Sequence, residues 1–155
     1  STLFPYTTLF RSLRYGAMAT GWTQVGGAWY YFASNGAMRS STWISSRGRW
    51  FYLNGSGAML TGSWAALNGQ WYYFAADGAM ATGWTQVGSA WYYFGGGGQW
   101  ASGTSTCPDW APIKGNKDSG IYHRPGQQSY DRTVAEQCFS SSVDAERAGY
   151  RAAKR

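Results

Sequence analysis

Pairs of tryptophans seven residues apart recur along the chain, and their ring faces are the first chemistry that this sequence offers. Residues 13–106 hold a single acidic residue, Asp77, and neither His nor Cys. Glycoside hydrolysis by paired carboxylates, catalytic triads and most metal sites are therefore excluded for this segment. The pairs are Trp22 and Trp29, Trp43 and Trp50, Trp64 and Trp71, and Trp84 and Trp91.

The tryptophan pairs belong to a unit of about twenty residues that occurs in four copies. Gly-Ala-Met marks the units at steps of 20, 21 and 21 residues, and Trp100 stands at the Met position of a degenerate fifth. Each unit contains a two-residue turn such as Asn68-Gly69, which favours the positive φ angles of tight hairpins. A lone hairpin cannot bury its aromatic face, but stacked hairpins can. We therefore predict a mainly β fold, a β-hairpin solenoid of about four 20–21-residue repeats followed by a small α+β module.

Composition agrees with this prediction. Charged residues make up 13% of the 155 residues and aromatic residues 19%, a balance that argues against disorder. The 22 glycines argue against a helical bundle, because glycine weakens helix interiors. The net charge of +6 rests on few charges, so we expect no nucleic-acid partner. No apolar run is long enough to cross a bilayer, and we expect no membrane insertion.

Three segments follow one another along the chain. Residues 1–12 resemble the in-frame translation of a short-read sequencing adapter and are left out of the fold prediction, so we expect the remainder to be a C-terminal fragment. Residues 13–106 form the repeat array. Residues 107–155, the C-terminal module, hold eight of the thirteen basic and six of the seven acidic residues. In this module Ser141 begins a capping box, and Gly149 ends the short helix predicted between them.

Units such as Gly21-Trp22-Thr23-Gln24-Val25, Trp29-Tyr30-Tyr31-Phe32 and Gly36-Ala37-Met38 resemble the choline-binding, or cell-wall-binding, repeats of Gram-positive surface proteins. The resemblance covers about 90 residues in four copies. It implies a non-catalytic, extracellular module that is associated with the cell wall and needs no cofactor. The partner that it implies is a bacterial cell-wall polymer, teichoic acid decorated with choline, to which the module would anchor a missing N-terminal domain.

The choline cage of this family suits the ligand, because a trimethylammonium group has no hydrogen-bond donor and ring faces attract its charge. The family's cage takes both tryptophans of one repeat, an aromatic residue of the next and often the following Met. Trp84 and Trp91 are not followed by a full repeat, so no fourth set is assigned. We expect Tyr31 and Phe32 to be mostly structural. Carried over position by position, the resemblance implies three ligand-binding sets: Trp22, Trp29, Phe51 and Met59; Trp43, Trp50, Tyr72 and Met80; and Trp64, Trp71, Tyr92 and Trp100.

Three alternatives stay open at this stage. The repeats could bind glucans or other polysaccharides, because sugar rings stack on the same aromatic faces. The chain could be the C-terminal targeting tail of a murein hydrolase, with the catalytic part missing. The aromatic residues could also be nothing more than the core of a spacer.

The C-terminal module resembles a small domain at the ends of bacterial secreted nucleases and surface proteins, called the sunset domain, for which no reaction is implied. Two cysteines in a secreted chain favour a disulfide between Cys107 and Cys138. Free thiols, a metal site with His123, and a Cys138–His123 nucleophile pair are the alternatives, and we expect no metal. The resemblance rests on Cys107-Pro108, Pro112-Ile113-Lys114-Gly115-Asn116, Ile121-Tyr122-His123-Arg124-Pro125-Gly126, Tyr130-Asp131-Arg132-Thr133, Cys138-Phe139 and Ala148-Gly149-Tyr150-Arg151.

Overall fold

The computed structural model describes residues 18–101, 103 and 106–154, so the prediction for residues 1–12 lies outside the described residues. Strands dominate this part of the chain, and the predicted mainly β fold of hairpin repeats is confirmed. The described residues form two compact units, one of residues 18–64 and 74–80, the other of residues 65–73 and 81–154 with the same gaps. Each unit is described by itself below.

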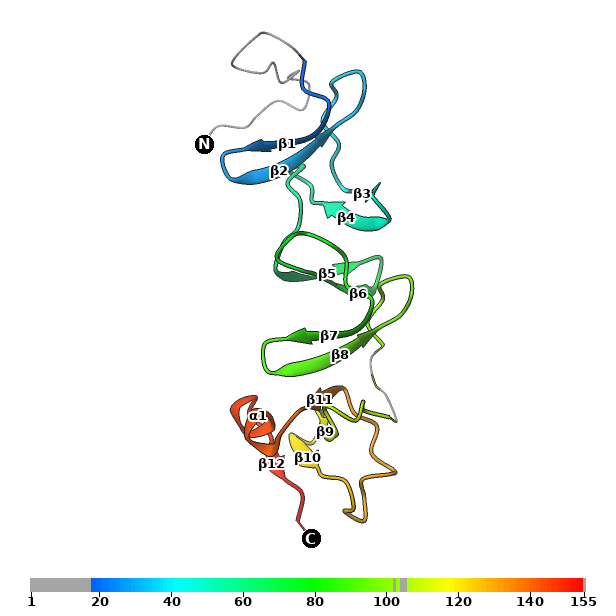
Figure 1. Ribbon diagram of the computed structural model, residues 1–155, viewed down its shortest axis with the longest axis vertical. Helices are drawn as coiled ribbons and strands as arrows, with labels where there is room; N and C mark the ends of the chain where they lie inside the picture. Colours follow the sequence, from blue (N-terminus) through cyan, green and yellow to red (C-terminus); the bar gives the residue numbers. More distant parts are fainter. Residues whose placement is uncertain (1–17, 102, 104–105, 155) are drawn as a thin grey trace. The chain divides into compact units, whose positions relative to one another are not determined.

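In the described part of the chain, each of the four repeats contributes one antiparallel hairpin (Figure 1). The turns adopt the left-handed geometry that the sequence predicts, with φ of +52° at Asn68 and +77° at Gly69. The hairpins are β1 (Gly21–Val25) with β2 (Ala28–Phe32), β3 (Thr42–Ser46) with β4 (Arg49–Leu53), β5 (Ser63–Leu67) with β6 (Gln70–Phe74), and β7 (Gly83–Val87) with β8 (Ala90–Phe94).

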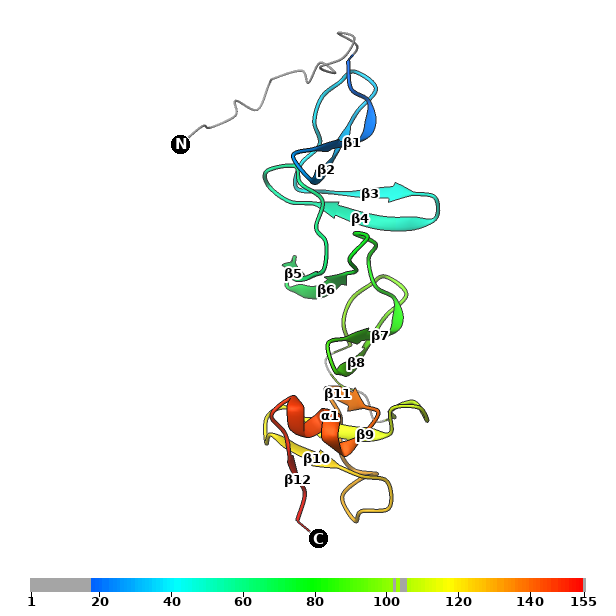
Figure 2. The same ribbon diagram turned by 60° about the vertical axis from the view of Figure 1, so that its left-hand side comes forward.

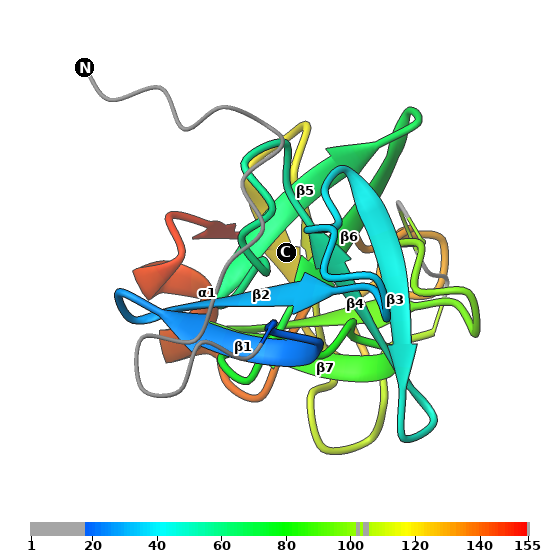
Figure 3. The same cartoon turned by 90° about the horizontal axis from the view of Figure 1, so that it is seen from above.

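Successive hairpins of the first unit run across one another, as β1–β2 and β3–β4 show (Figures 2 and 3). The Gly-Ala-Met segment ties them together. The backbone N–H of Met59 donates to the carbonyl of Trp29 at 2.8 Å, and that of Met80 donates to Trp50 at the same distance. In the second unit Trp100 donates to Trp71 at 2.7 Å. Trp100 therefore holds the backbone position that methionine holds in the other units.

The core of each repeat is the last apolar residue of its second strand. These residues are almost completely buried, and each pairs across the backbone with the Met-position residue that follows. The prediction that Phe32 is structural is confirmed. The pairs are Phe32 with Met38, Leu53 with Met59, Phe74 with Met80, and Phe94 with Trp100.

The C-terminal module adds its strands to the fourth hairpin. They are β9 (Ile113–Asn116), β10 (Ile121–His123), β11 (Gln137–Phe139) and β12 (Arg151–Ala152), and the six-stranded sheet runs in the order β12-β10-β9-β11-β8-β7. Strand β11 lies against β8 with Cys138 opposite Trp91. The sheet thus passes across the predicted boundary between residues 106 and 107.

The predicted short helix is confirmed as α1 (Ser142–Arg147). The Ser141 hydroxyl accepts a hydrogen bond from the backbone N–H of Asp144, as the capping box requires. Gly149, with φ of +91°, follows the C-terminal end. No helix among the described residues has the length and apolar character needed to cross a membrane.

Candidate functional site

The two tryptophans of a repeat lie on one face of their hairpin. In the first repeat Trp22 pairs with Tyr31 and Gln24 pairs with Trp29. Because side chains alternate between the two faces of a strand, these four side chains share a face, while Phe32 points to the other. The turn and the strand register therefore place both tryptophan rings of a repeat on the same face of its hairpin.

Trp22 is the centre of the first predicted set. Its ring lies 5.2 Å from that of Phe51 and 5.3 Å from that of Tyr31, both in edge-to-face geometry. Such pairs hold aromatic side chains in fixed orientations. Tyr31 therefore packs against Trp22 on the hairpin face that holds both tryptophans, and its assignment as mostly structural stays a prediction.

Phe51 is covered to a greater extent than the other rings of this set. Only 7% of it is exposed, and the guanidinium carbon of Arg49 lies 5.5 Å from its ring centroid. Arg49 in turn forms a salt bridge with Asp77. The ring therefore serves as an inner wall beside Trp22, and one positive charge already lies near it.

The second tryptophan of each of the first three repeats is the most open ring of its set. Trp29, Trp50 and Trp71 are 41%, 47% and 48% exposed. Exposed indoles repeated at one position are costly to leave in water unless they have a ligand, because apolar surface gains free energy on burial. These three rings are the strongest candidates for contact with a ligand.

The members of the other two predicted sets are distributed over the two units. Trp43 lies 5.1 Å from Tyr52 in edge-to-face geometry, within the first unit, which also holds Trp50, Met80 and Trp64. Tyr72, Trp71, Tyr92 and Trp100 belong to the second unit. There the rings of Tyr92 and Trp100 are 6.1 Å apart.

Tyr92 has a second role that sequence reasoning missed. Its hydroxyl accepts a hydrogen bond from the Gln137 side chain at 2.6 Å, and its ring packs on the core of the C-terminal module beside Ala90 and Phe139. Burial raises the pKa of Tyr92, and the hydrogen bond from Gln137 opposes this shift. No local sequence signal indicated this contact, because Gln137 lies 45 residues further along the chain.

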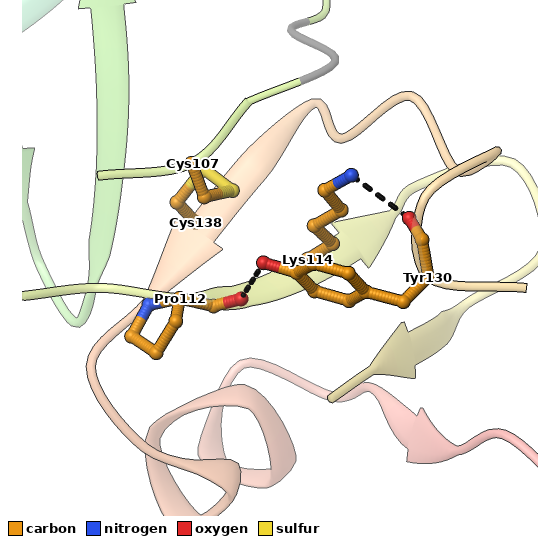
Figure 4. The surroundings of a disulfide bond; sticks show 5 residues. All are labelled: Cys107, Pro112, Lys114, Tyr130 and Cys138. Atoms are coloured by element: carbon orange, nitrogen blue, oxygen red, sulfur yellow. Dashed lines mark hydrogen bonds between the residues drawn. A yellow bond between two sulfur atoms is a disulfide. The ribbon is translucent and has the colours of Figure 1, made fainter. Parts of the chain in front are cut away.

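Cys107 and Cys138 are joined by a disulfide in the structure, with their Cα atoms 5.7 Å apart (Figure 4). A disulfide sulfur is neither a thiolate ligand nor a nucleophile, so in this state neither cysteine can serve the alternatives that paired it with His123. The disulfide lies in a buried cluster with Ala111 and Ala135, on which Trp84 and Trp91 pack. The module thus covers the tryptophan pair that has no following repeat.

A buried lysine stands near this disulfide (Figure 4). The Lys114 ammonium donates to the carbonyl of Tyr130 at 2.8 Å and lies 4.3 Å from the centroid of the Tyr130 ring, whose hydroxyl donates to Pro112. Burial lowers the pKa of Lys114, and the Asp131 carboxylate opposes the shift. Burial and then the Lys114 charge lower the pKa of His123, which favours its neutral form. These contacts satisfy the ammonium internally and stabilise the loop around Tyr130.

The comparisons with known proteins identify the family of the repeats. The profile of the choline-binding repeat family matches residues 19–64 and 60–104. A second family, ArfC, matches residues 93–152, a range that begins on β8, the strand with which β11 of the C-terminal module pairs. The sunset resemblance stays a prediction. No curated protein sequence matches this chain.

Several solved structures are similar to this chain. Choline binding protein F of Streptococcus pneumoniae is 38% identical, over 68% of this chain and 35% of that chain, with a TM-score of 0.55. In the presence of a peptidoglycan analogue, a tetrasaccharide-pentapeptide, the same protein has a TM-score of 0.56. The multimodular pneumococcal cell wall endolysin of phage Cp-1, solved with choline, is 39% identical over 55% of this chain and 25% of that chain, with a TM-score of 0.51. This chain therefore spans about a third of the first protein's length and a quarter of the second's.

Proposed function

The chain belongs to the choline-binding repeat family, and we propose that it is a non-catalytic module that attaches a larger protein to choline-bearing polymers of the bacterial cell wall. The observation that carries this proposal is the exposure of Trp29, Trp50 and Trp71 at one repeated position. Each ring shares a hairpin face with the first tryptophan of its repeat, so two indoles are available to one ligand. The similar endolysin, solved with choline, and choline binding protein F, solved in the presence of a peptidoglycan analogue, support the same ligand class.

A quaternary ammonium is the group that these faces suit best. It needs no hydrogen-bond acceptor, and the described array places no carboxylate among the predicted rings of the first set, Trp22, Trp29 and Phe51. The π-face of an indole supplies the attraction instead, at about 0.5–2 kcal/mol for each ring. Three rings give roughly 4 kcal/mol, which corresponds to a millimolar site.

Weak single sites suit attachment to a polymer. When several choline groups on one strand meet several repeats, each binding event after the first is intramolecular, and the overall affinity rises by about two to four orders of magnitude. Attachment would then be firm on the wall while free choline is held loosely. We propose teichoic acid as the carrier of the choline groups, and a wall-acting protein as the one that the module attaches.

The test is a choline titration of tryptophan fluorescence on the chain, at constant ionic strength. We expect a saturable change at millimolar choline that loses about a third of its amplitude in Trp50→Ala. Trp110→Ala is the matched control, because Trp110 is an exposed indole outside the repeats, and it should leave the choline response intact. A flat response to choline together with a saturable response to glucan oligosaccharides would replace the proposal by the polysaccharide alternative.

A further inference from the structure

The fourth repeat exposes a different ring from the first, although their strands have the same sequence. Both hairpins read Gly-Trp-Thr-Gln-Val and Ala-Trp-Tyr-Tyr-Phe. In the first, Trp29 is exposed and Tyr31 is half-buried. In the fourth, Trp91 is half-buried and Tyr93 is 43% exposed. The difference must come from what packs on each hairpin, since the strands themselves are identical.

The C-terminal module accounts for this exchange. Trp91 is held against the Cys107–Cys138 disulfide cluster and meets Trp110 edge-to-face at 6.1 Å. Its indole Nε1 is buried without a hydrogen-bond partner among the described residues. A cage built on Trp91, like those proposed for the first three repeats, is therefore closed off here.

Trp84 is half-buried and packs on the same cluster, whereas Tyr93 is exposed beside it. They are cross-strand partners, with ring centroids 5.3 Å apart and an angle of 61° between the ring planes, so they form two walls of a corner. The two rings line a shallow, open pocket of about 230 Å³ together with Thr106, Cys107 and Pro108. In the first repeat Trp22 has Tyr31 on one side and Phe51 of the next repeat on the other. The segment from Thr106 to Pro108 thus stands where the next repeat would stand.

The wall from the module is held in place from two sides. The disulfide fixes Cys107 to β11, and the N–H of Ala111 donates to the carbonyl of Pro108 at 2.9 Å, which closes a tight turn. The disulfide and the turn therefore fix the Cys107–Pro108 wall of this open pocket.

We infer that this junction holds a further site for a quaternary ammonium group, made by Trp84 and Tyr93 of the fourth repeat and by the Thr106–Pro108 segment of the C-terminal module. The volume is below the range of about 300–1,000 Å³ that drug-sized ligands occupy, so it suits one compact group. The walls carry no basic side chain, and two ring faces attract a cation.

This inference rests on the proposed function, and the experiment separates the two. The chain is labelled with 15N, and its indole N–H signals are followed during titration with choline chloride against a sodium chloride control. Trp84→Phe assigns the Trp84 signal. A triple variant, Trp29→Ala with Trp50→Ala and Trp71→Ala, removes the exposed rings of the first three repeats and leaves the junction as it is.

We expect the triple variant to keep one saturable millimolar response at the Trp84 signal. Adding Tyr93→Ala should raise the dissociation constant by about threefold to tenfold, the effect of one lost ring. Tyr93 is exposed, so its truncation leaves the fold in place. Val143→Ala, an exposed apolar truncation on α1, is the control and should change nothing. Reduction of the disulfide should weaken the Trp84 response as well, because the Cys107 wall is released.

The outcomes distinguish the two proposals. If the chain responds at the repeat tryptophans but the triple variant does not respond at Trp84, the junction site is wrong and the proposed function stands. If only Trp84 responds in the unaltered chain, the junction site stands and the proposed cages fail. A Trp84 signal that moves with glucose and ignores choline would overturn the ligand class.

Discussion

The first and fourth hairpins share every residue of their strands and differ in the rings that they present to solvent. Trp29 is open in the first, whereas Trp91 is covered in the fourth and Tyr93 is open in its place. The first hairpin is followed by another repeat, and the fourth is followed by a module that continues its sheet. The comparison shows that a repeat sequence fixes which rings share a face, while the neighbour decides which of them a ligand can reach.

The two regions also differ in how they are held together. The repeats bury the last apolar residue of each hairpin and tie successive repeats through backbone hydrogen bonds, such as that from the Met59 N–H to the Trp29 carbonyl. The module adds a covalent bond, a buried lysine and a core of its own around Phe139 and Tyr150. A small module with few apolar residues needs such a link, because its core alone supplies little stability.

Reduction of the Cys107–Cys138 disulfide is the change with the largest expected effect on this comparison. The bond closes a loop over a separation of 31 residues, and such loops stabilise by about 3–4 kcal/mol. We expect a reductant to lower the thermal midpoint of the module and to leave the choline response of Trp50 unchanged, as measured by circular dichroism and fluorescence. The double variant Cys107→Ala with Cys138→Ala should be insensitive to reductant. An equal loss in both regions would mean that the two unfold together.

Trp91→Ala and Trp50→Ala should give opposite results, although the two residues hold the same position in their repeats. Trp91 packs on the disulfide cluster, so its removal should cost about 2–3 kcal/mol of stability and no choline binding. Trp50 is exposed, so its removal should cost less than about 1 kcal/mol and remove one binding site. Urea denaturation combined with a choline titration measures both quantities. Similar stability losses for the two variants would contradict the covering role of the module.

Gly78→Ala tests the packing between two successive repeats of the array. Gly78 has φ of +83°, and a Cβ there would overlap the thioether of Met59. We expect a loss of about 2 kcal/mol from strain and overlap together. Gly69→Ala is the matched control, because its φ of +77° imposes similar strain while the space around it is open, and it should cost about 1 kcal/mol. Equal losses in urea denaturation would show that Met59 moves aside without cost.

Asp77→Asn is expected to have the smallest effect. The backbone N–H of Ala79 and then the Arg49 guanidinium lower the pKa of Asp77 from its ordinary value of 3.8. The pKa of Asp77 is lower in the folded state than in the unfolded state. The carboxylate therefore stabilises the fold fully when the pH is above the unfolded pKa, and this contribution is lost as the pH falls through the folded pKa. Both side chains are exposed, so the salt bridge contributes less than about 1 kcal/mol.

The consequence is measurable as a small difference between two stability curves. The unaltered chain should be slightly more stable than Asp77→Asn at pH 7, and the two should converge as the pH falls below the lowered pKa of Asp77. A constant difference between pH 7 and pH 2 would show that the effect does not depend on the carboxylate charge.

The sequence by itself determined the hairpins, their turns and the face that each ring occupies. These are local properties: the alternation of side chains along a strand places Trp22 and Trp29 together, and left-handed residues such as Asn68 and Gly69 mark the turns. The same local logic predicted α1, because a capping residue and a terminal glycine act within one or two helical turns.

Tertiary structure alone decided which rings are accessible. Burial depends on segments that are distant in sequence. The residues of β7 and β8 therefore do not indicate that β11 pairs at Trp91 or that the segment around Cys107 packs on Trp84. It also decided that Phe51 is an inner wall beside Arg49 and that Tyr92 serves the core of the module. Identical strands thus acquire different surfaces, because the free energy of covering an aromatic ring is set by its neighbours and not by its own sequence.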